Sequence, residues 1–364
     1  MKIGIDARPL SYSLTGIGFY LKFLLDELQI IDNINEYFLI SNAQIHYRLK
    51  NRKWHKIEGK LKRKLLSTAW MQVKCCSISE KFKLDLFWSP RHHLPLLMPA
   101  TIKTVLTVHD MVHHRYPETM SLPNLLAERM LLRRSIRKSN KIITDSWATA
   151  NDILSIYKVD PSKIRVINPG VPPISYKNED FGPVPKKYLL FVGTLDPRKN
   201  VIRILKAFEQ IDPISRGLHL VLVGGKGWKN IDLLRQLDRH RLKSNIHMKG
   251  YICREELSAL YRNALCLLFP SLYEGFGFPI LEAMASGTPV ITSNISSMKE
   301  VSGDAAYLID PYNINEIAGA MLDVMENETL RKQMRNKGFQ RIQMFSWKEC
   351  AKKTLQTFNE VMGI

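Results

Sequence analysis

Residues 270–294, which read PSLYEGFGFPILEAMASGTPVITSN, constrain the fold more than any other part of this chain. An apolar run at 265–269 comes directly before them and predicts a buried strand. Turn residues follow, then a helix that begins near Pro279, and then a short apolar strand that begins at Val290. A strand, loop, helix and strand in this order indicate an open α/β sheet.

Two glycines and two glutamates in this stretch predict a ligand site. Gly275 and Gly277 let the loop backbone approach a ligand, and amides at the helix start can receive a phosphate or sugar oxygen. Glu274 lies on the loop and Glu282 on the helix, so both should lie near the same crevice. A carboxylate accepts two hydroxyl hydrogen bonds at once, which suits a ribose or a hexose. In the competing interpretation Glu274 caps the helix and Glu282 is solvated, but the glycines between them favour the ligand site.

The length and the cysteine content limit the class of protein. A chain of 364 residues is long enough for two domains with substantial cores. Its five cysteines include no Cys-x-x-Cys pair, so neither a disulfide framework nor a zinc site is indicated. Asp6 and Arg8 interrupt the first apolar run, and no apolar run approaches the length of a membrane span. We therefore expect a cytoplasmic protein of a reducing compartment.

The net charge of +19 requires an explanation, and nucleic acid, an anionic membrane face and anionic substrates are all candidates. Between Arg48 and Lys64 the chain has nine lysines and arginines and only one acid, Glu58. Apolar residues are interspersed, and those at 61, 65 and 66 could share a helical face, which fits docking on anionic lipid. Equally, this apolar side could pack on its own domain. The residues that we assign to acceptor or membrane contact are Arg52, Lys53, Lys60, Lys62, Arg63 and Lys64.

Alternating strands and helices predict two doubly wound halves. In the first half we expect strands at 2–6, 36–41, 85–89, 101–108, 141–145 and 164–167, and helices at 19–29, 125–139 and 149–157. In the second half we expect strands at 188–192, 219–223 and 246–250 and a helix at 255–263. Prolines and glycines gather between the halves, so we expect domains at 1–172 and 188–346 joined by a linker at 173–187.

Residues at the expected strand ends are further candidates, because open α/β sheets bind ligands at the carboxyl ends of their strands. His109 follows the strand at 101–108, where it either bonds a sugar hydroxyl and assists proton movement or is a satisfied loop histidine. Gly16 and Gly18 precede a helix and can cradle a phosphate. Leu21 stands in the place of the third glycine of a dinucleotide fingerprint, so this turn is weak evidence by itself.

Arg198 and Lys199 lie at the mouth of a helix that follows the strand at 188–192. Cations are unfavourable at the start of a helix, because the helix dipole is positive there. A bound anion would resolve this conflict, so the pair predicts an anion site.

The segment EGFGFPILEAMASGTPV resembles the donor-site signature of the retaining glycosyltransferases of family 4. The resemblance spans nearly the whole chain and is densest between residues 188 and 311. It implies the GT-B fold, an α/β fold of two Rossmann-like doubly wound domains facing across a cleft. The domain at 1–172 would bind the acceptor, the domain at 188–346 would bind the nucleotide sugar, and a last helix at 347–364 would cross back to the first domain.

The resemblance also implies roles for individual residues. Arg198 and Lys199 would grip the donor diphosphate, although many members have an arginine where this chain has Thr194. Glu282 would hold the ribose hydroxyls, Glu274 the sugar hydroxyls, and His109 would sit at the reacting sugar. The other residues implied in donor binding are Gly16 and Gly18 at the phosphates, Tyr251 and Ile252 at the base, and Gly275, Phe276, Gly277, Phe278 and Ile280 around the hexose.

The resemblance implies a retaining hexosyltransferase that needs no metal and no cofactor besides its nucleotide-sugar donor. The chain looks most like mannosyltransferases and related transferases of bacterial surface polysaccharides, so GDP-mannose is the expected donor, with a UDP-sugar as the alternative. The expected acceptor is a lipid-linked glycan of surface polysaccharide or lipopolysaccharide synthesis at the inner face of the cytoplasmic membrane. A basic nucleic-acid-binding protein and a lectin-like module are the alternatives from other classes. The first would need a known motif or aromatic residues interleaved on a basic platform, and the sequence has neither. The glutamates and the cation pair argue against the second.

Overall fold

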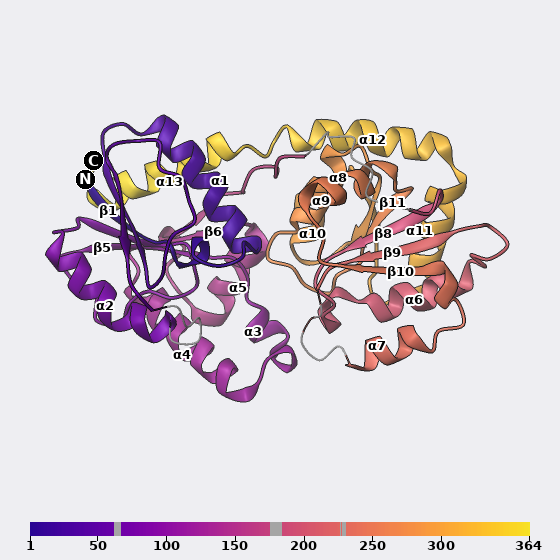
Figure 1. Ribbon diagram of the computed structural model, residues 1–364, viewed down its shortest axis with the longest axis horizontal. Helices are drawn as coiled ribbons and strands as arrows, with labels where there is room; N and C mark the ends of the chain where they lie inside the picture. The colour runs from indigo at the N-terminus through magenta and orange to yellow at the C-terminus, as the bar shows by residue number, and fades with distance from the viewer. Residues whose placement is uncertain (62–66, 175–183, 226, 228–230) are drawn as a thin grey trace. The chain divides into compact units, whose positions relative to one another are not determined.

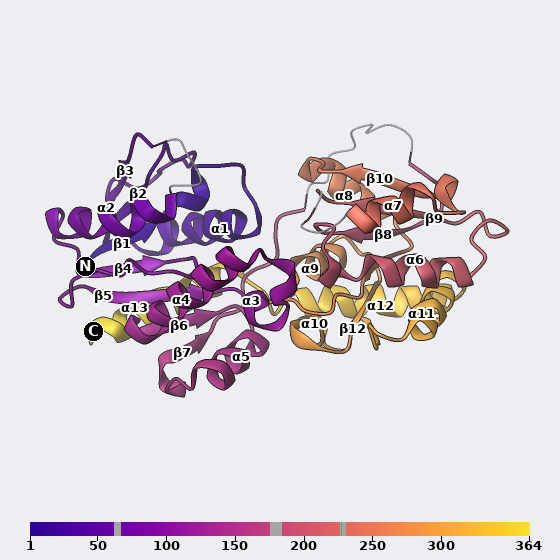
Figure 2. The same ribbon diagram turned by 90° about the horizontal axis from the view of Figure 1, so that it is seen from below.

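The computed structural model describes residues 1–61, 67–174, 184–225, 227 and 231–364. They form two compact units, each an open parallel sheet with helices on both faces (Figures 1 and 2). The first unit comprises Met1–Met111, Leu122–Gly170 and Ser346–Ile364, and the second comprises Val112–Ser121 and Val171–Phe345. The predicted α/β class of two doubly wound halves is confirmed.

The first unit contains a sheet of seven parallel strands in the order β3-β2-β1-β4-β5-β6-β7. The strands are β1 (Lys2–Asp6), β2 (Glu36–Ser41), β3 (Trp54–Glu58), β4 (Leu86–Ser89), β5 (Lys103–Val108), β6 (Lys141–Thr144) and β7 (Ile164–Val166). The helices are α1 (Gly16–Ile31), α2 (Ser67–Lys81), α4 (Leu122–Lys138), α5 (Trp147–Tyr157) and α13 (Trp347–Met362). The strand order reverses between β1 and β4, so loops that leave these two strands diverge and open a crevice at their carboxyl ends.

The second unit contains a sheet of six parallel strands in the order β10-β9-β8-β11-β12-β13. The strands are β8 (Tyr188–Val192), β9 (His219–Val223), β10 (Ile246–Gly250), β11 (Cys266–Phe269), β12 (Val290–Ser293) and β13 (Tyr307–Ile309). The helices are α3 (Val112–Arg115), α6 (Val201–Gln210), α7 (Ile231–Asp238), α8 (Arg254–Asn263), α9 (Phe278–Ala285), α10 (Ser296–Ser302), α11 (Ile314–Glu326) and α12 (Glu328–Ile342). Here the order reverses between β8 and β11.

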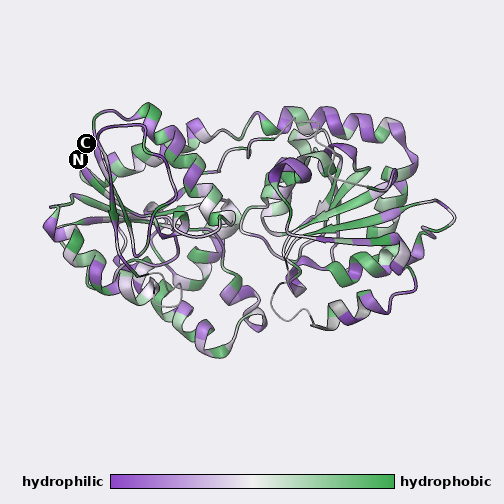
Figure 3. Cartoon of the chain, in the orientation of Figure 1, coloured by the Kyte–Doolittle hydropathy of each residue, from purple (hydrophilic) through white to green (hydrophobic). Residues whose placement is uncertain are grey.

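The central strands are continuous apolar runs because both faces of each sheet are covered. Every residue of β8 (YLLFV) and of β11 (CLLF) is buried. A strand that is buried on both faces needs no alternation of polar and apolar residues, and this is typical of parallel sheets. Figure 3 shows the same pattern, with hydrophobic strands between helices whose outer sides are hydrophilic.

The predicted strands at 2–6, 36–41, 188–192, 219–223 and 246–250 match the structure residue by residue. The helix expected at 19–29 begins earlier, at Gly16, so Gly16 and Gly18 form the first turn of α1 and not a loop before it. A Cβ atom on Gly18 would lie 2.9 Å from Leu14 Cδ2 and 3.2 Å from the Pro9 carbonyl oxygen. Gly18 therefore lets the loop after β1 fold tightly against the helix.

The described part of the basic segment at 48–64 packs on its own domain. It contains β3, an edge strand parallel to β2, in which Trp54 is buried and stacks on Tyr37 at a ring-centroid distance of 4.2 Å. Trp54 therefore packs on its own domain, whereas Leu65 and Leu66, on which the expected helical face depends, lie outside the described residues. Arg52, Lys53 and Lys60 are exposed, whereas Lys62, Arg63 and Lys64 lie outside the described residues. Residues 175–183 of the expected linker also lie outside them.

The C-terminal helix α13 is part of the first unit. The ring centroid of Trp347 lies 5.8 Å from that of Tyr20 and 5.4 Å from that of Phe23, which are both on α1. A Cβ atom on Gly170 would lie only 2.3 Å from the backbone nitrogen of Trp347, so a glycine is needed there. Near the other end of the helix, Phe358 is fully buried, and its ring centroid lies 5.5 Å from that of Trp88 on β4.

We predict that Phe358→Ala lowers the free energy of unfolding of the first unit by about 3–5 kcal/mol, because it leaves a cavity in a core that cannot fully collapse. Urea denaturation followed by tryptophan fluorescence measures this, since Trp54, Trp70, Trp88, Trp147 and Trp347 all belong to the first unit. Lys353→Ala on the exposed face of α13 is the control and should change the free energy by less than about 0.5 kcal/mol. Equal effects of the two substitutions would contradict a packed contact between α13 and the sheet.

Candidate functional site

In the second unit, the loops after β8 and β11 meet at the point where the strand order reverses. The first loop contains Arg198 and Lys199, and the second contains Glu274. Arg198 Nη1 donates to Glu274 Oε2 at 2.8 Å, and Lys199 Nζ donates to Glu274 Oε1. The three charged residues that the sequence indicated at separate positions therefore form one ion cluster, at the place where doubly wound sheets bind ligands.

The cluster is buried, and this changes the proton affinities of its members. Lys199 and Glu274 are 7% and 8% exposed. Burial alone would raise the pKa of Glu274, but Arg198 and Lys199 outweigh it and lower that pKa to about 2. Burial lowers the pKa of Lys199, and the charge of Glu274 offsets only part of this. The Lys199 ammonium also lies 4.9 Å from the ring centroid of Phe269. Asp196 Oδ2 also lies 4.0 Å from Arg198 Nη2, so two carboxylates face the two cations of this cluster.

Hydrogen bonds from the first turn of α10 and from Asn200 hold the Glu274 loop in place. The hydroxyls of Ser296 and Ser297 both donate to the Glu274 carbonyl oxygen at 2.8 Å. The Asn200 side chain donates to the carbonyl oxygens of Pro270 at 3.0 Å and of Pro311 at 2.7 Å. Gly277 then starts α9 with a φ of 105°, a conformation that residues with a Cβ rarely adopt. The loop is therefore shaped before any ligand binds.

Glu282 belongs to a second cluster with its own partners. The Tyr261 hydroxyl donates to Glu282 Oε2 at 3.0 Å, and Arg254 Nη2 lies 3.8 Å from Glu282 Oε1. Burial raises the pKa of Glu282, and Arg254 and Tyr261 offset part of this. The sequence interpretation did not single out Arg254 or Tyr261. Their spacing of seven residues puts them on the same side of α8, and this was the signal that could have identified them.

The remaining residues predicted for donor binding differ in exposure. Tyr251 is 78% exposed after β10, and Ile252 packs against the apolar core. Phe276 and Ile280 are buried in the same core, so their side chains support the loop and only their backbone can face a ligand.

Glycines bring the loop ends of this sheet close together. A Cβ atom on Gly224 would lie 2.0 Å from the Gly193 carbonyl oxygen, and Gly224 has a φ of 146°. The backbone nitrogen of Gly224 donates to the Gly250 carbonyl oxygen at 2.8 Å. The loops after β8, β9 and β10 are thus joined through backbone groups, and no side chain occupies the contact between Gly193 and Gly224.

The first unit has a cavity of about 220 Å³ where its own strand order reverses. Its lining residues are Arg8, Pro9, Tyr12, Ser13, Thr15, Ile17, Ser67, Thr68 and Arg91. Each nitrogen of the Arg8 guanidinium is engaged, because Nε donates to Asp6 Oδ1 at 2.8 Å, Nη2 to Asp6 Oδ2 at 2.7 Å and Nη1 to the Ser67 carbonyl oxygen at 2.9 Å. No hydrogen bond or ion pair of the Arg91 guanidinium occurs within the described ranges. Burial and the nearby charge of Arg8 lower the pKa of Arg91, so this cavity suits an anionic or hydroxyl-rich ligand.

His109 follows β5, as predicted. It is buried, and both of its ring nitrogens are engaged. Its Nδ1 lies 2.7 Å from Asp145 Oδ2, and its Nε2 lies 3.0 Å from the Pro90 carbonyl oxygen. Both partners can only accept, so both nitrogens donate and the ring is a cation. Burial opposes that charge, but Asp145 outweighs it and the pKa of His109 is raised. A role of His109 in proton movement stays a prediction, and its geometry favours a fixed positive charge.

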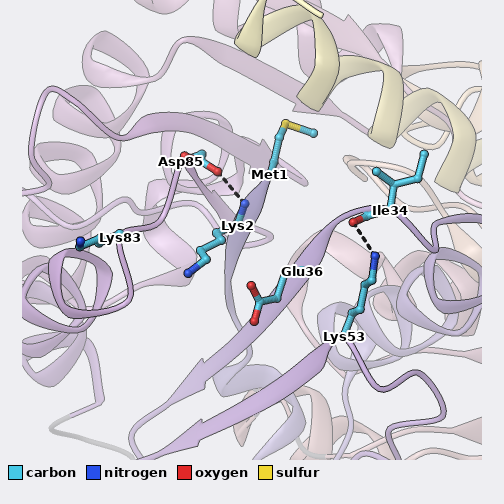
Figure 4. A pocket seen from close by; sticks show the side chains of 7 residues that line it. All are labelled: Met1, Lys2, Ile34, Glu36, Lys53, Lys83 and Asp85. Carbon is cyan, nitrogen blue, oxygen red and sulfur yellow. Dashed lines mark hydrogen bonds between the residues drawn. The ribbon is translucent and has the colours of Figure 1, made fainter.

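A shallower cavity of about 500 Å³ lies at the amino ends of β1 and β2, away from the loops described above (Figure 4). In Figure 4, Lys53 Nζ donates to the Ile34 carbonyl oxygen at 3.1 Å, and the backbone nitrogen of Lys2 donates to Asp85 Oδ2 at 2.7 Å. The lysines at this cavity are exposed, and we assign no ligand to it. Over the described part of the chain, no group of three or more His, Cys, Asp or Glu side chains is placed to hold a metal ion. Nor does any helix there have the length and apolarity needed to cross a membrane.

Two families match the chain in succession. Residues 44–173 match the family described as Glycosyltransferase Family 4, and residues 176–341 match the family described as Glycosyl transferases group 1.

Two relatives are O-antigen mannosyltransferases. O-antigen chain mannosyltransferase B of Escherichia coli is 28% identical over 384 residues, which cover 98% of this chain and 99% of that protein. O-antigen chain mannosyltransferase RfbU of Salmonella typhimurium is 33% identical over 228 residues, which cover 62% of this chain and 61% of that protein.

Solved glycosyltransferase structures have the same GT-B fold. Sucrose-phosphate synthase from Thermosynechococcus elongatus superposes with a TM-score of 0.80 at 19% identity, covering 100% of this chain and 99% of that one. WaaG, a glycosyltransferase involved in lipopolysaccharide biosynthesis, superposes with a TM-score of 0.72 at 15% identity, covering 97% of this chain and 98% of that one. The predicted GT-B fold is therefore confirmed.

We predict that the stabilisation provided by Glu274 is lost in acid. Its folded pKa of about 2 lies below its ordinary value of 4.5, so the contribution is complete above pH 4.5 and decreases as the pH falls toward 2. The difference in unfolding free energy between the wild type and Glu274→Gln should therefore shrink by about 2 kcal/mol between pH 6 and pH 3. Urea denaturation at each pH measures it, with the exposed Glu326→Gln as control. A difference that does not depend on pH would contradict the buried cluster.

We predict that Arg91→Met stabilises the first unit in the absence of anions, since it removes a partly buried charge that has no hydrogen bond or ion pair in the described part of the chain. A gain of about 1 kcal/mol would raise the melting temperature by roughly 2–4 °C. Inorganic phosphate should stabilise the wild type more than the variant. Arg52→Met, at an exposed position of the same unit, should show neither effect. Destabilisation by Arg91→Met would mean that Arg91 has a structural role.

Proposed function

Because this chain belongs to the family 4, group 1 glycosyltransferases, we propose that it is a retaining, metal-independent mannosyltransferase that uses GDP-mannose. The acceptor is a hydroxyl of a lipid-linked glycan in the synthesis of a surface polysaccharide or lipopolysaccharide. The O-antigen mannosyltransferases among its relatives support the sugar and the class of product. No metal or further cofactor takes part in the proposed reaction.

The observation that carries the proposal is the cluster of Arg198, Lys199 and Glu274 at the strand reversal of the second unit. A nucleoside diphosphate has more negative charge than one carboxylate, so it competes with Glu274 for the two cations. Once the diphosphate holds Arg198 and Lys199, the Glu274 carboxylate is released to accept hydrogen bonds from the sugar hydroxyls. The same residues thus account for a stable empty site and for a charged donor site.

The transfer step needs positive charge where the leaving group develops negative charge. The bond between the anomeric carbon and the diphosphate oxygen breaks, and the sugar passes through an oxocarbenium-like state. The acceptor oxygen then bonds to the anomeric carbon on the same face, which retains the configuration. Its proton goes to the departing phosphate oxygen, so no side-chain base is needed. Arg198 and Lys199 stabilise the diphosphate, and the backbone at Phe276–Phe278 orients the hexose.

The nucleoside would be held by the second cluster. Glu282, oriented by Tyr261 and Arg254, accepts hydrogen bonds from the ribose hydroxyls. The backbone at Tyr251 and Ile252 receives the base. Backbone atoms contact the base there, so the local shape of this loop would distinguish guanine from uracil. UDP-sugars remain the alternative donors.

The cavity at Arg8 and Arg91 in the first unit is the proposed place of the acceptor. Its volume of about 220 Å³ and its polar lining suit a sugar ring or the phosphate of a lipid-linked glycan. The protein would act as a peripheral protein on the inner face of the cytoplasmic membrane, where such acceptors are found.

We predict that GDP and GDP-mannose raise the melting temperature of the protein without added metal, whereas UDP, ADP and their sugars do not. A thermal-shift panel measures this. A response to UDP alone would keep the transferase and replace the donor. A shift with RNA or DNA and none with any nucleotide would favour the nucleic-acid-binding alternative and overturn the proposal.

We predict that Arg198→Ala combined with Lys199→Ala weakens GDP-mannose binding at least tenfold, because both cations that neutralise the diphosphate are removed. Glu282→Ala should weaken both GDP and GDP-mannose, since the ribose contact is common to them. Lys206→Ala removes an exposed cation of α6 nearby and serves as the control. Isothermal titration calorimetry measures all three. Wild-type affinity in the double variant would show that the site has been assigned wrongly.

A further inference from the structure

Helix α4 of the first unit exposes a stripe of large apolar side chains. Leu122, Leu126 and Met130 are 67%, 58% and 52% exposed. They are spaced four residues apart and therefore lie on one side of the helix. Leu125, Leu132 and Ile136 on the same helix are buried in the unit. The buried side of α4 therefore packs on the first unit, and the exposed stripe lies on another side of the same helix.

The same side of the helix continues into a cationic half. Arg133, Arg134 and Arg137 are exposed. The one acid of α4, Glu128, is turned away, since His92 Nδ1 and His93 Nε2 lie 3.2 and 3.1 Å from its Oε1. The exposed face of α4 therefore carries arginines and no carboxylate, which the sequence of the helix alone does not show.

An apolar cavity adjoins the cationic half. It has a volume of about 360 Å³ and is lined by residues 94–97, Arg134, Ser135 and Lys138. Two hydrogen bonds hold the loop at 94–97 to the helix. The Leu94 backbone nitrogen donates to Ser135 Oγ at 2.9 Å, and Lys138 Nζ donates to the Leu96 carbonyl oxygen at 2.9 Å. Leu97 at its rim is 76% exposed. Figure 3 shows both hydrophobic and hydrophilic colours along α4.

We propose that this surface, formed by Leu97, Leu122, Leu126, Met130, Arg133, Arg134 and Arg137 and here named the α4 face, docks on an anionic phospholipid bilayer. The leucines and the methionine enter the boundary between headgroups and acyl chains, and the arginines bind lipid phosphates. The position differs from the basic segment at 48–64, in which Trp54 is buried inside the fold. The docking itself is independent of the proposed function. Only its role, which is to bring the protein to a lipid-linked acceptor, rests on that function.

Lipid is favoured over nucleic acid by the kind of apolar residue. Nucleic-acid surfaces combine cations with aromatic rings on which bases stack. The α4 face has cations but only aliphatic side chains and a thioether beside them. Such side chains gain from leaving water and have no ring for a base to stack on.

The test is co-sedimentation of the full chain with vesicles of 30% phosphatidylglycerol and 70% phosphatidylcholine, compared with vesicles of phosphatidylcholine alone. The wild type should bind the anionic vesicles at least tenfold more tightly, and high salt should weaken this binding. Arg133→Gln, Arg134→Gln and Arg137→Gln together should reduce binding about 100-fold, at roughly fivefold for each arginine. Leu126→Gln with Met130→Gln should reduce it at least tenfold.

Matched controls come from the same unit. Lys348→Gln, Lys352→Gln and Lys353→Gln remove three exposed cations from α13, and Ile30→Gln with Ile34→Gln removes two exposed apolar side chains. Both control variants should keep at least half of the binding. Equal losses in controls and α4 variants would overturn the proposal, because they would indicate a general charge effect.

Two further outcomes would also overturn it. One is a wild type that does not bind anionic vesicles. The other is binding of single-stranded RNA that is lost in the α4 variants while vesicle binding is unchanged. The α4 variants should keep the melting-temperature shift with GDP, so a failure of docking is distinguishable from a failure of the donor site.

Discussion

The buried contact of Glu274 with Arg198 and Lys199 is the interaction on which the second unit's site depends. It joins the loop after β8 to the loop after β11, which leave neighbouring strands in opposite directions. Two cations this close would repel each other without the carboxylate between them, so removal of Glu274 destabilises both loops. Glu274 therefore holds Arg198 and Lys199 in position for a diphosphate. In the proposed donor complex, the same carboxylate accepts hydrogen bonds from the sugar hydroxyls.

The charged residues at the strand reversal of the first unit are arranged differently. Its sheet also reverses at its central strand pair, and Arg8 and Arg91 lie in the loops that leave β1 and β4. There, Asp6 forms its ion pair with Arg8, and the described part of the chain gives the Arg91 guanidinium no hydrogen bond or ion pair of its own. The ion cluster of the second unit is therefore paired without a ligand, whereas the cavity at Arg91 would gain stability from an anionic or hydroxyl-rich ligand. The α4 face adds a third positive region, in this case beside apolar side chains.

Much of the fold followed from pattern, because strands buried on both faces are apolar throughout and helices between them are bounded by clear turns. The strands at 2–6 and 188–192 were predicted to the residue for this reason. The edge strand β3 was missed, since its charged sequence WHKIE alternates only weakly and a strand at an edge needs little apolar surface. The predicted start of α1, at residue 19, was too late because glycine is usually unfavourable inside a helix. In the structure α1 begins at Gly16, and Gly18 leaves room for the preceding loop because it has no side chain.

By itself, the sequence determined the α/β class, the two halves and the identity of the charged residues at the strand ends, because these depend on local periodicity and turn chemistry. Only the tertiary structure decided which of those residues meet. It placed Glu274 between Arg198 and Lys199, gave Glu282 to Tyr261 and Arg254, bound both nitrogens of His109, and turned Glu128 inward to leave α4 cationic. These pairings join residues tens of positions apart, and their partners are chosen by strand order and burial, which no local pattern records.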